Sequence, residues 1–359
     1  MKTNIIIIFS CLILCGCITE FEPNYRDEVA GILVVDGIIT DDESVITLSR
    51  SKGLSFEDNI FDLSPYHVTD AKVYIECDDG TQWGVTSQNS GEYTIVTEKL
   101  NRARQYRLKI EFESHEYCSE FAYPMDPPEI DLYWTKKDKG QPVNIHLETN
   151  ASDNAAHYYR WSYREDWEFR AKVPMAGYPY LCSKHYHSKG LMLGTDEKNS
   201  SGQTIKILTE ISPSDDRLAV LYRIDATQHA ITKRAFDYYT NITKNARNSG
   251  SIFAQHPSEL KGNITCVTDP ARIAIGFVDI SSNTRGRLYI YRDEDVYEQD
   301  YIVSICYKPY QSGAYYPGSV LIGGSYIELF CIDCRLNGGR PINELPDDWP
   351  NQYPIEDYD

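Results

Sequence analysis

The chain has 359 residues, with 35 lysines and arginines against 53 aspartates and glutamates, which gives a formal net charge of −18. A chain this acidic, without a basic run, repels nucleic acid and anionic lipid, so we expect no nucleic-acid partner. Its 28 tyrosines and 11 phenylalanines favour strands over helices. The length suggests two domains, each large enough to bury a core, and we expect a mainly β protein.

The N-terminus has the pattern of an export signal. Lys2 precedes an apolar run over residues 5–15, which matches a signal-peptide core and is too short to span a bilayer. Leu14 and Gly16 stand at positions −3 and −1 before Cys17, as in a bacterial lipoprotein cleavage site. We predict a lipoprotein signal over residues 1–16, cleavage between Gly16 and Cys17, and acyl chains such as palmitate on Cys17.

Residues 17–29 would then be a lipidated tether that holds the chain on a membrane through Cys17. Ile18 replaces the aspartate that would retain the chain in the inner membrane, and Glu20 and Glu22 follow closely. We therefore expect an outer-membrane, lipid-anchored protein that faces the cell surface. A plain secretory signal with coincidental cysteines is the alternative.

Period-two alternation over residues 30–124 predicts an N-terminal β-sandwich, immunoglobulin-like or prealbumin-like. Strands are expected at 31–40, 44–51, 91–95 and 106–112. A hairpin is expected around Gly80, because an Asp-Gly pair supplies the positive φ of a tight turn. A second turn is expected near Ser114.

Three prolines in residues 123–130 interrupt this pattern and indicate a domain boundary. A second β-rich domain is expected over residues 125–345, with strands at 130–134, 143–149, 157–169 and 218–226. One inserted amphipathic helix is predicted at about 229–247, where an apolar residue recurs every three to four positions. Residues 346–359 form an acidic, proline-containing tail that we expect to be extended.

Aromatic side chains recur on one face of the strand predicted at 157–169. Trp161, Tyr163 and Trp167 are candidate binding aromatics, because such a face could form a platform for a sugar or a peptide. A stripe of this kind is more often the core of a sandwich.

Seven cysteines follow the tether, and in an exported chain they are candidates for disulfides: Cys77, Cys118, Cys182, Cys266, Cys306, Cys331 and Cys334. A local bridge between Cys77 and Cys118 is reasonable, but the sequence leaves the connectivity open. A zinc or redox role for the CIDC motif is disfavoured because no second ligand pair accompanies it. His185 and His187 near Cys182 could bind a metal, although two ordinary histidines are the better interpretation, so we expect no metal site.

Motifs in the second half resemble a known family. They are Gly262-Asn263-Ile264, Asp269-Pro270, Gly276-Phe277, Cys331-x-Asp333-Cys334-Arg335, Gly338-Gly339 and Trp349. In these the chain resembles a large family of Bacteroidota outer-membrane lipoproteins filed as domain of unknown function 4249. Members are typically encoded beside TonB-dependent receptors, which implies such a receptor as partner and an accessory role in nutrient capture or uptake.

No GxSxG, HExxH, phosphate-binding or dinucleotide-binding motif is found in the sequence. We expect no catalytic residues and no cofactor. The leading hypothesis is a non-enzymatic accessory lipoprotein with an unknown cargo. A surface adhesive or structural subunit is the alternative, and an exported hydrolase is third.

Overall fold

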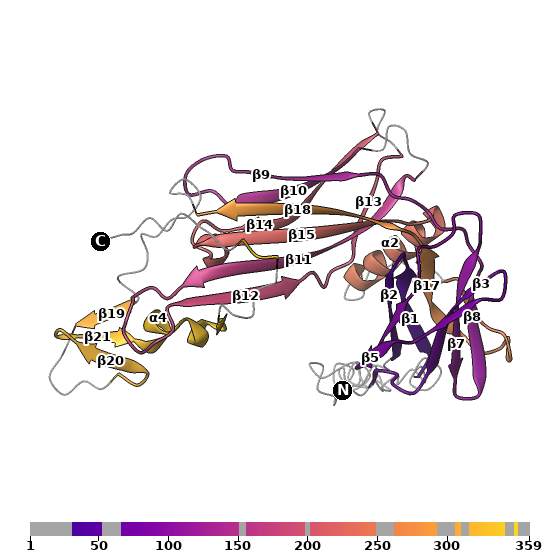
Figure 1. Cartoon of the computed structure of the whole chain (residues 1–359), viewed down its shortest axis with the longest axis horizontal. Coiled ribbons are helices and arrows are strands. Elements are labelled where there is room, and N and C mark those ends of the chain that lie inside the picture. The colour runs from indigo at the N-terminus through magenta and orange to yellow at the C-terminus, as the bar shows by residue number, and fades with distance from the viewer. Residues whose placement is uncertain are drawn as a thin grey trace, which may run out of the picture.

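The computed structural model describes residues 31–51, 66–150, 156–197, 202–248, 262–292, 306–309, 316–341 and 348–350. The predicted signal, Gly16, Cys17 and the tether lie outside these residues. Two β-sandwiches follow one another in space, with the strands of the second running across those of the first (Figure 1). No helix within the described residues is long and apolar enough to cross a bilayer.

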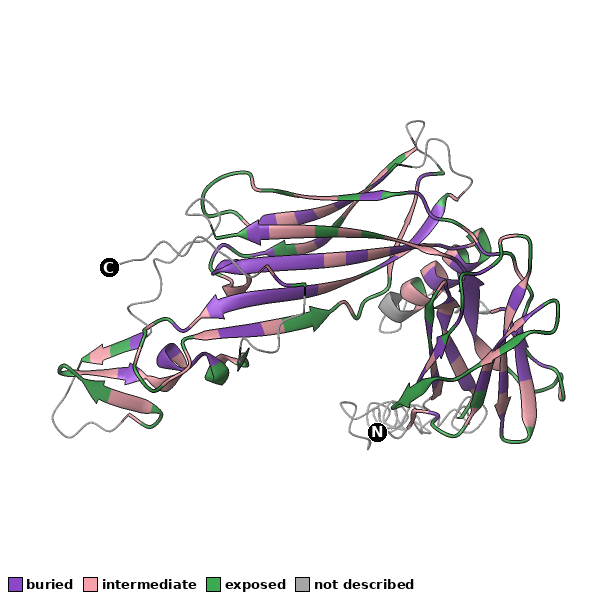
Figure 2. Cartoon of the chain, in the orientation of Figure 1, coloured by how far each residue is buried: buried purple, intermediate pink, exposed green. Residues whose placement is uncertain are grey.

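The first sandwich packs two five-stranded sheets face to face. One sheet has the order β17-β1-β2-β6-β5, with β17 Ala274–Ile280, β1 Leu33–Ile39, β2 Glu43–Arg50, β6 Glu92–Val96 and β5 Ser87–Asn89. The other has the order β16-β8-β7-β3-β4, with β16 Ile264–Cys266, β8 His115–Ser119, β7 Tyr106–Phe112, β3 Lys72–Cys77 and β4 Gln82–Gly84. In the longer strands, such as β1 and β7, buried residues alternate with less buried ones, and the buried residues form one core (Figure 2).

Both predicted turns of this sandwich are confirmed. Gly80 has a φ of 90° in the turn between β3 and β4. Glu113 and Ser114 take positive φ values between β7 and β8, where a short turn matches the twist of the two strands.

The first sandwich also contains strands that the division at residue 124 misses. β17 pairs in parallel with β1, from Leu33 opposite Ala274 to Ile39 opposite Ile280, and β16 pairs with β8. The proline-rich segment is where the chain first leaves the sandwich, but residues 262–280 return to complete both sheets. A short strand that pairs only with a partner more than 200 residues away gives no local signal of its destination.

The second sandwich packs a three-stranded sheet on a larger one. The smaller sheet has the order β14-β10-β9, with β14 Gln203–Ile211, β10 Val143–Asn150 and β9 Ile130–Thr135. The larger has the order β18-β15-β11-β12-β22, with β18 Asn283–Tyr291, β15 Leu221–Ala230, β11 Tyr158–Arg170, β12 Leu181–His187 and β22 Arg340–Pro341, and β13 Met192–Thr195 also pairs with β11. The facing sides of the two sheets bury the second core.

Helix α2, Lys233–Asn248, lies where the two sandwiches meet (Figure 1). It begins four residues later than predicted because β15 continues to Ala230. The predicted apolar stripe is confirmed at Ile231, Ala235 and Tyr238, which are buried in a cluster with Tyr158 of β11 and Phe277 of β17. The helix therefore contacts both sandwiches.

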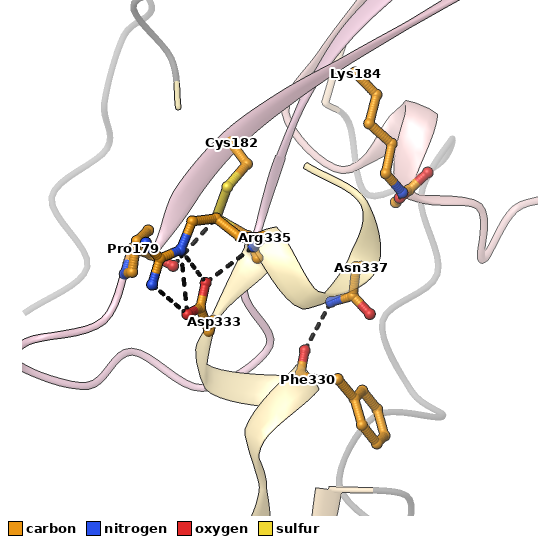
Figure 3. Close-up of a disulfide and its surroundings, with 9 residues drawn as sticks. Pro179, Cys182, Lys184, Phe330, Asp333, Arg335 and Asn337 are labelled. Atoms are coloured by element: carbon orange, nitrogen blue, oxygen red, sulfur yellow. Dashed lines mark hydrogen bonds and ion pairs between the residues drawn. A yellow bond between two sulfur atoms is a disulfide. The ribbon is translucent and has the colours of Figure 1, made fainter. Parts of the chain in front are cut away.

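A small C-terminal module completes the described chain. Its sheet has the order β19-β21-β20, with β19 Tyr307–Pro309, β21 Ser325–Glu328 and β20 Ser319–Ile322, and it leads into α4 Leu329–Ile332 and the 3₁₀ helix η3 Cys334–Asn337. The disulfide Cys306–Cys331 lies within this module. The disulfide Cys182–Cys334 joins the module to β12 (Figure 3).

The other three cysteines, Cys77, Cys118 and Cys266, are free and buried. The predicted bridge between Cys77 and Cys118 is wrong. β7 lies between their strands, and Cys77 points into the core beside Tyr106 whereas Cys118 lies opposite Lys109 on the other face. Cysteines on opposite faces of a sheet cannot be bridged without moving the backbone.

Candidate binding groove on the outer face of the second sandwich

The larger sheet carries polar side chains on the face that points away from its core. Antiparallel pairing brings β11, β15 and β18 into register, so these side chains form rows across the strands. The rows are Arg160–His229–Asn283, Ser162–Thr227–Arg285, Arg164–Asp225–Arg287 and Asp166–Arg223–Tyr289.

Two hollows lie along these rows. The first, of about 330 Å³, is bounded by β1 and β2 of the first sandwich and by the Arg160 row. The second, of about 630 Å³, extends along the same face to Asp348. Both are lined by Ser162, Thr227 and Arg285, so together they form one continuous depression, which we call the outer groove.

Arg160 and Asp36 join the two sandwiches at the closed end of the outer groove. The Arg160 guanidinium donates to both Asp36 carboxylate oxygens, at 2.9 and 2.8 Å. Burial alone would raise the pKa of Asp36, but the hydrogen bonds and charge of Arg160 outweigh it and hold that pKa below its ordinary value. The Tyr239 hydroxyl of α2 lies 3.2 Å from the same carboxylate. A bidentate pair of this kind fixes orientation as well as distance.

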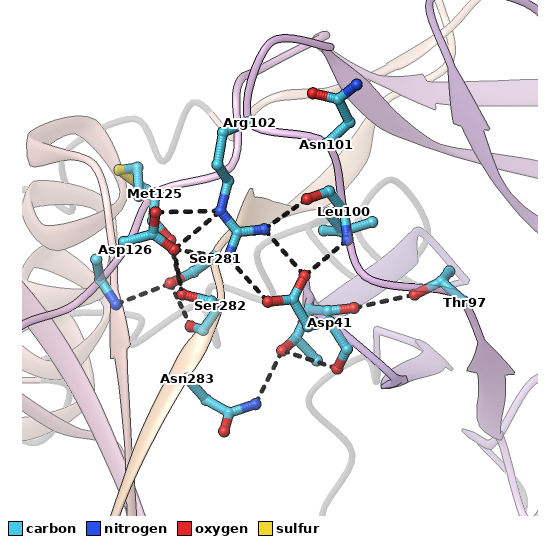
Figure 4. A network of polar contacts seen from close by, with 12 residues as sticks. Asp41, Thr97, Leu100, Asn101, Arg102, Met125, Asp126, Ser281, Ser282 and Asn283 are labelled. Carbon is cyan, nitrogen blue, oxygen red and sulfur yellow. Dashed lines mark hydrogen bonds and ion pairs between the residues drawn. The ribbon is translucent and has the colours of Figure 1, made fainter.

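Two of the chain crossings between the sandwiches are also tied together (Figure 4). Arg102 donates to Asp41 at 2.8 Å and to Asp126 at 2.9 Å, and the Ser282 hydroxyl donates to Asp126 at 2.6 Å. Ser282 N donates to the Met125 carbonyl at 2.9 Å, which pairs the crossing after β8 with the crossing between β17 and β18, both of which run from the first sandwich to the second. The junction that shapes the outer groove is therefore held by two linked connections.

His229 lies in the first hollow as a neutral imidazole. Burial lowers its pKa to about 4, and the positive charges of Arg160 and Arg285 act in the same direction. Its Nδ1 lies 3.3 Å from the Ser282 carbonyl, to which the neutral ring donates. Nε2 is then an acceptor, which suits a ligand hydroxyl or amide.

Arg285 provides accessible positive charge in the outer groove. It is exposed, lines both hollows, and forms no ion pair within the described part of the chain. The groove thus combines neutral donors and acceptors with an exposed guanidinium, that of Arg285, which has no ion-pair partner among the described residues. This combination suits recognition of polar or acidic groups on a partner.

Arg223 organises the second hollow, although its side chain is almost completely buried. It lies 3.0 Å from Asp166 and from Asp225 and 2.8 Å from Asp348. Burial acts to lower the pKa of Arg223, but these carboxylates raise it above its ordinary value. Arg287 forms ion pairs with Asp225 and Asp348. Charges on this face are matched across neighbouring strands, so the buried Arg223 and Asp166 each have a partner of opposite charge.

The predicted aromatic platform is not on the surface. Trp161 and Trp167 are buried in the second core, and Tyr163 packs against that core partly buried. The Trp161 indole donates to the Gln228 side chain at 2.7 Å. The core interpretation of this stripe is therefore correct.

The histidine pair lies on β12 beside the second hollow. His185 and His187 have ring centroids 6.1 Å apart, and His187 lines the groove. Cys182 is part of a disulfide and is not available as a metal ligand. Over the described ranges, no three His, Cys, Asp or Glu side chains gather as a metal site would require.

Sequence reasoning missed Arg160, Ser162 and Arg164, which lie on β11 on the face opposite its aromatic stripe. Their partners come from β15, β18, β1 and the tail, and β-strand register cannot be read from one strand alone. The only local signal was that this strand alternates aromatic and charged residues over its length.

Comparison with known proteins identifies a family but no function. None of the curated proteins matches the chain. A two-fibronectin type-III domain segment of chicken tenascin matches with 10% identity and a TM-score of 0.16, covering 56% of this chain and 91% of tenascin's segment. A DUF4785 family protein of Legionella pneumophila matches with 12% identity and a TM-score of 0.18, covering 56% of this chain and 51% of that one. At these scores neither likeness carries an argument about this chain.

The family model described as Domain of unknown function (DUF4249) matches residues 18–287. The match takes in the first sandwich and the second sandwich as far as Arg287 in β18, and it ends before the disulfide-linked module. The chain therefore belongs to the DUF4249 family.

Proposed function

We propose that this chain is a non-enzymatic, lipid-anchored binding protein of the outer membrane that acts as an accessory to a TonB-dependent receptor. The lipoprotein pattern at Cys17 supports the location, and the family resemblance supports the receptor as partner. In this role the chain binds the receptor or its cargo through surface recognition and makes no covalent bond.

The outer groove is the observation that carries the binding role. It is continuous over two hollows, it is bounded at one end by the first sandwich, and its charged groups are held in place by neighbours on adjacent strands. Prepositioned polar groups lose little conformational freedom on binding, so they favour recognition. Arg285 offers the partner a charge that does not first have to leave another ion pair.

The test is purification of the tagged full-length protein from its native outer membrane in mild detergent, with intact-mass analysis of what co-elutes. We expect a barrel-sized receptor in stoichiometric yield. Recovery of the lipoprotein alone would contradict the proposal.

Two charge reversals then test the groove. Arg285→Glu should reduce receptor recovery at least about tenfold, the scale expected when a like charge faces a buried interface. Lys139→Glu makes the same change of charge in the exposed turn between β9 and β10, away from the groove, and should leave recovery unchanged. Equal recovery with both variants would remove the groove from the docking surface.

The alternative, a surface adhesive or structural subunit, is favoured by one different feature. β14 is an edge strand of nine residues, and its Ile205 and Ile207 are 56% and 50% exposed. A long apolar edge can pair with another strand. If this function holds, the purified chain forms concentration-dependent oligomers in sedimentation experiments, and Ile207→Lys returns it to a monomer.

A further inference from the structure

Tail residues 348–350 lie on the sheet at the far end of the outer groove from the first sandwich. Asp348 contacts two arginines there: Arg223 Nη1 donates to one carboxylate oxygen at 2.8 Å, and Arg287 contacts the other. Two guanidinium groups thus hold one carboxylate between them. The pKa of Asp348 is held below its ordinary value by these hydrogen bonds.

Trp349 fills a small apolar pocket beside this pair. Its side chain packs with Val220 and Leu221 and is 6% exposed. The indole Nε1 donates to a carboxylate oxygen of Glu168, and the Arg223 guanidinium lies 5.2 Å from the ring centroid. The pocket therefore contacts both the N–H donor of the indole and its electron-rich face.

The sheet side of this contact is a complete recognition site. Without the tail, Glu168 would lose the indole donor and Arg223 would lose one of its three carboxylates. The site therefore retains its preference for a carboxylate followed by an indole, whichever chain supplies them.

The contact can open from the groove side. The side chains of Asp348 and Arg287 are 52% and 42% exposed, and both line the second hollow. An exposed ion pair contributes only about 0–1 kcal/mol, so an incoming acidic segment in the groove meets little resistance there. Burial of the indole contributes roughly 2–3 kcal/mol more. An interaction of this strength allows the tail to be exchanged for a segment of another protein.

We propose that Arg223, Arg287, Glu168 and the Trp349 pocket form a binding site for an acidic protein segment that carries a tryptophan. The chain's own tail fills the site in the free protein, and the segment of a partner protein displaces it. The tail is then an internal competitor that sets the affinity for the partner. The site is defined by its own contacts and does not depend on which receptor the chain serves.

The test uses a fluorescein-labelled peptide that copies residues 346–359, PDDWPNQYPIEDYD, and the mature full-length chain in detergent. Fluorescence anisotropy is measured with the wild type and with the double variant Asp348→Ala, Trp349→Ala. We expect saturable binding to the double variant and at least about tenfold weaker binding to the wild type, because a tail on the same chain competes at roughly millimolar effective concentration.

Two controls make the result specific. A peptide with alanine at the positions of Asp348 and Trp349 should not bind, and adding Arg287→Glu to the double variant should weaken binding at least about tenfold. Absence of saturable binding to a double variant that still unfolds cooperatively would overturn the proposal. Equal binding to wild type and double variant would also overturn it, since the peptide would then bind elsewhere.

A single variant keeps the proposal testable if the double variant does not fold. Asp348→Ala retains the buried indole and removes the ion pairs of Asp348 with the buried Arg223 and the partly exposed Arg287. It should bind the peptide at least about threefold more tightly than the wild type does, because the competing tail loses both ion pairs. An unchanged affinity would refute exchange at this site.

Discussion

Replacement of Asp279 by asparagine should change how the stability of the protein depends on pH. Asp279, at the end of β17, is buried and accepts hydrogen bonds from Thr232 N at 2.9 Å and from the Thr232 hydroxyl at 3.1 Å. Thr232 precedes α2, and its hydroxyl accepts from Ala235 N at 3.2 Å, as an N-cap does. The carboxylate therefore joins the start of the helix to the first sandwich.

The sign and size of the effect follow from the pKa of Asp279. Burial raises it from 3.8 to about 6, despite the hydrogen bonds from Thr232. Between these two values the folded chain binds a proton that the unfolded chain does not, so the contribution of Asp279 to stability falls as the pH rises. The full difference is roughly 3 kcal/mol, of which about 1.4 kcal/mol lies between pH 5 and pH 7.5.

Asparagine cannot titrate, so the variant lacks this dependence. Urea unfolding at about pH 7.5 and about pH 5 should show that the free energy of unfolding of Asp279→Asn, relative to wild type, falls by about 1.4 kcal/mol on acidification. Asp70→Asn, at an exposed aspartate, should follow the wild type. A relative free energy that stays constant or moves the other way would refute the reasoning.

Other substitutions have equally definite outcomes. His229→Asn should change the pH dependence of stability in the opposite direction. The folded-state pKa of His229 is about 4, so the wild-type protein loses stability as the pH falls below 6.5 and the variant lacks this loss. A free energy of unfolding that depends on pH equally in wild type and variant, measured in urea, would contradict this. Gly276→Ala should cost about 3 kcal/mol in denaturant midpoint experiments, since the new Cβ would lie 2.2 Å from the Val35 carbonyl oxygen. Gly190→Ala, which meets no atom within 4 Å, is its control. Replacing both members of the Cys182–Cys334 disulfide by serine should cost about 5 kcal/mol in the chain-entropy model for a separation of 152 residues, as measured by thermal unfolding; an unchanged melting temperature would show that the cross-link adds no stability. The three free cysteines should react with iodoacetamide only after denaturation, because they are buried, and mass spectrometry counts the adducts.

Local patterns predicted the elements that depend on neighbouring residues. The alternation in β7 and the Asp-Gly turn at Gly80 each involve contacts within a few positions, so the sequence contains the whole signal. The stripe of α2 was likewise visible, and only its first turn was misplaced. Binary patterning could also indicate which face of β11 was buried, because Trp161 alternates with Arg160 and Ser162.

The pairing of segments far apart in the chain could not be predicted from the sequence. The parallel pairing of β1 with β17 and the disulfide between Cys182 and Cys334 depend on how distant segments meet, and many pairings satisfy the same local pattern. The groove depends on register across β18, β15 and β11, and the tail contact depends on Arg223, whose role is visible only beside Asp348. The sequence of one segment does not show which other segment lies beside it.

The return of β17 to the first sandwich constrains the order in which the chain can fold. β1 and β2 can form a hairpin early, but the outer edge of β1 stays open until Ala274–Ile280 is available to pair with it. Until then a nearly finished sheet exposes an unpaired strand to the other chains around it, which is a route to aggregation. A truncation before residue 274 should therefore yield an aggregating fragment instead of an isolated first sandwich.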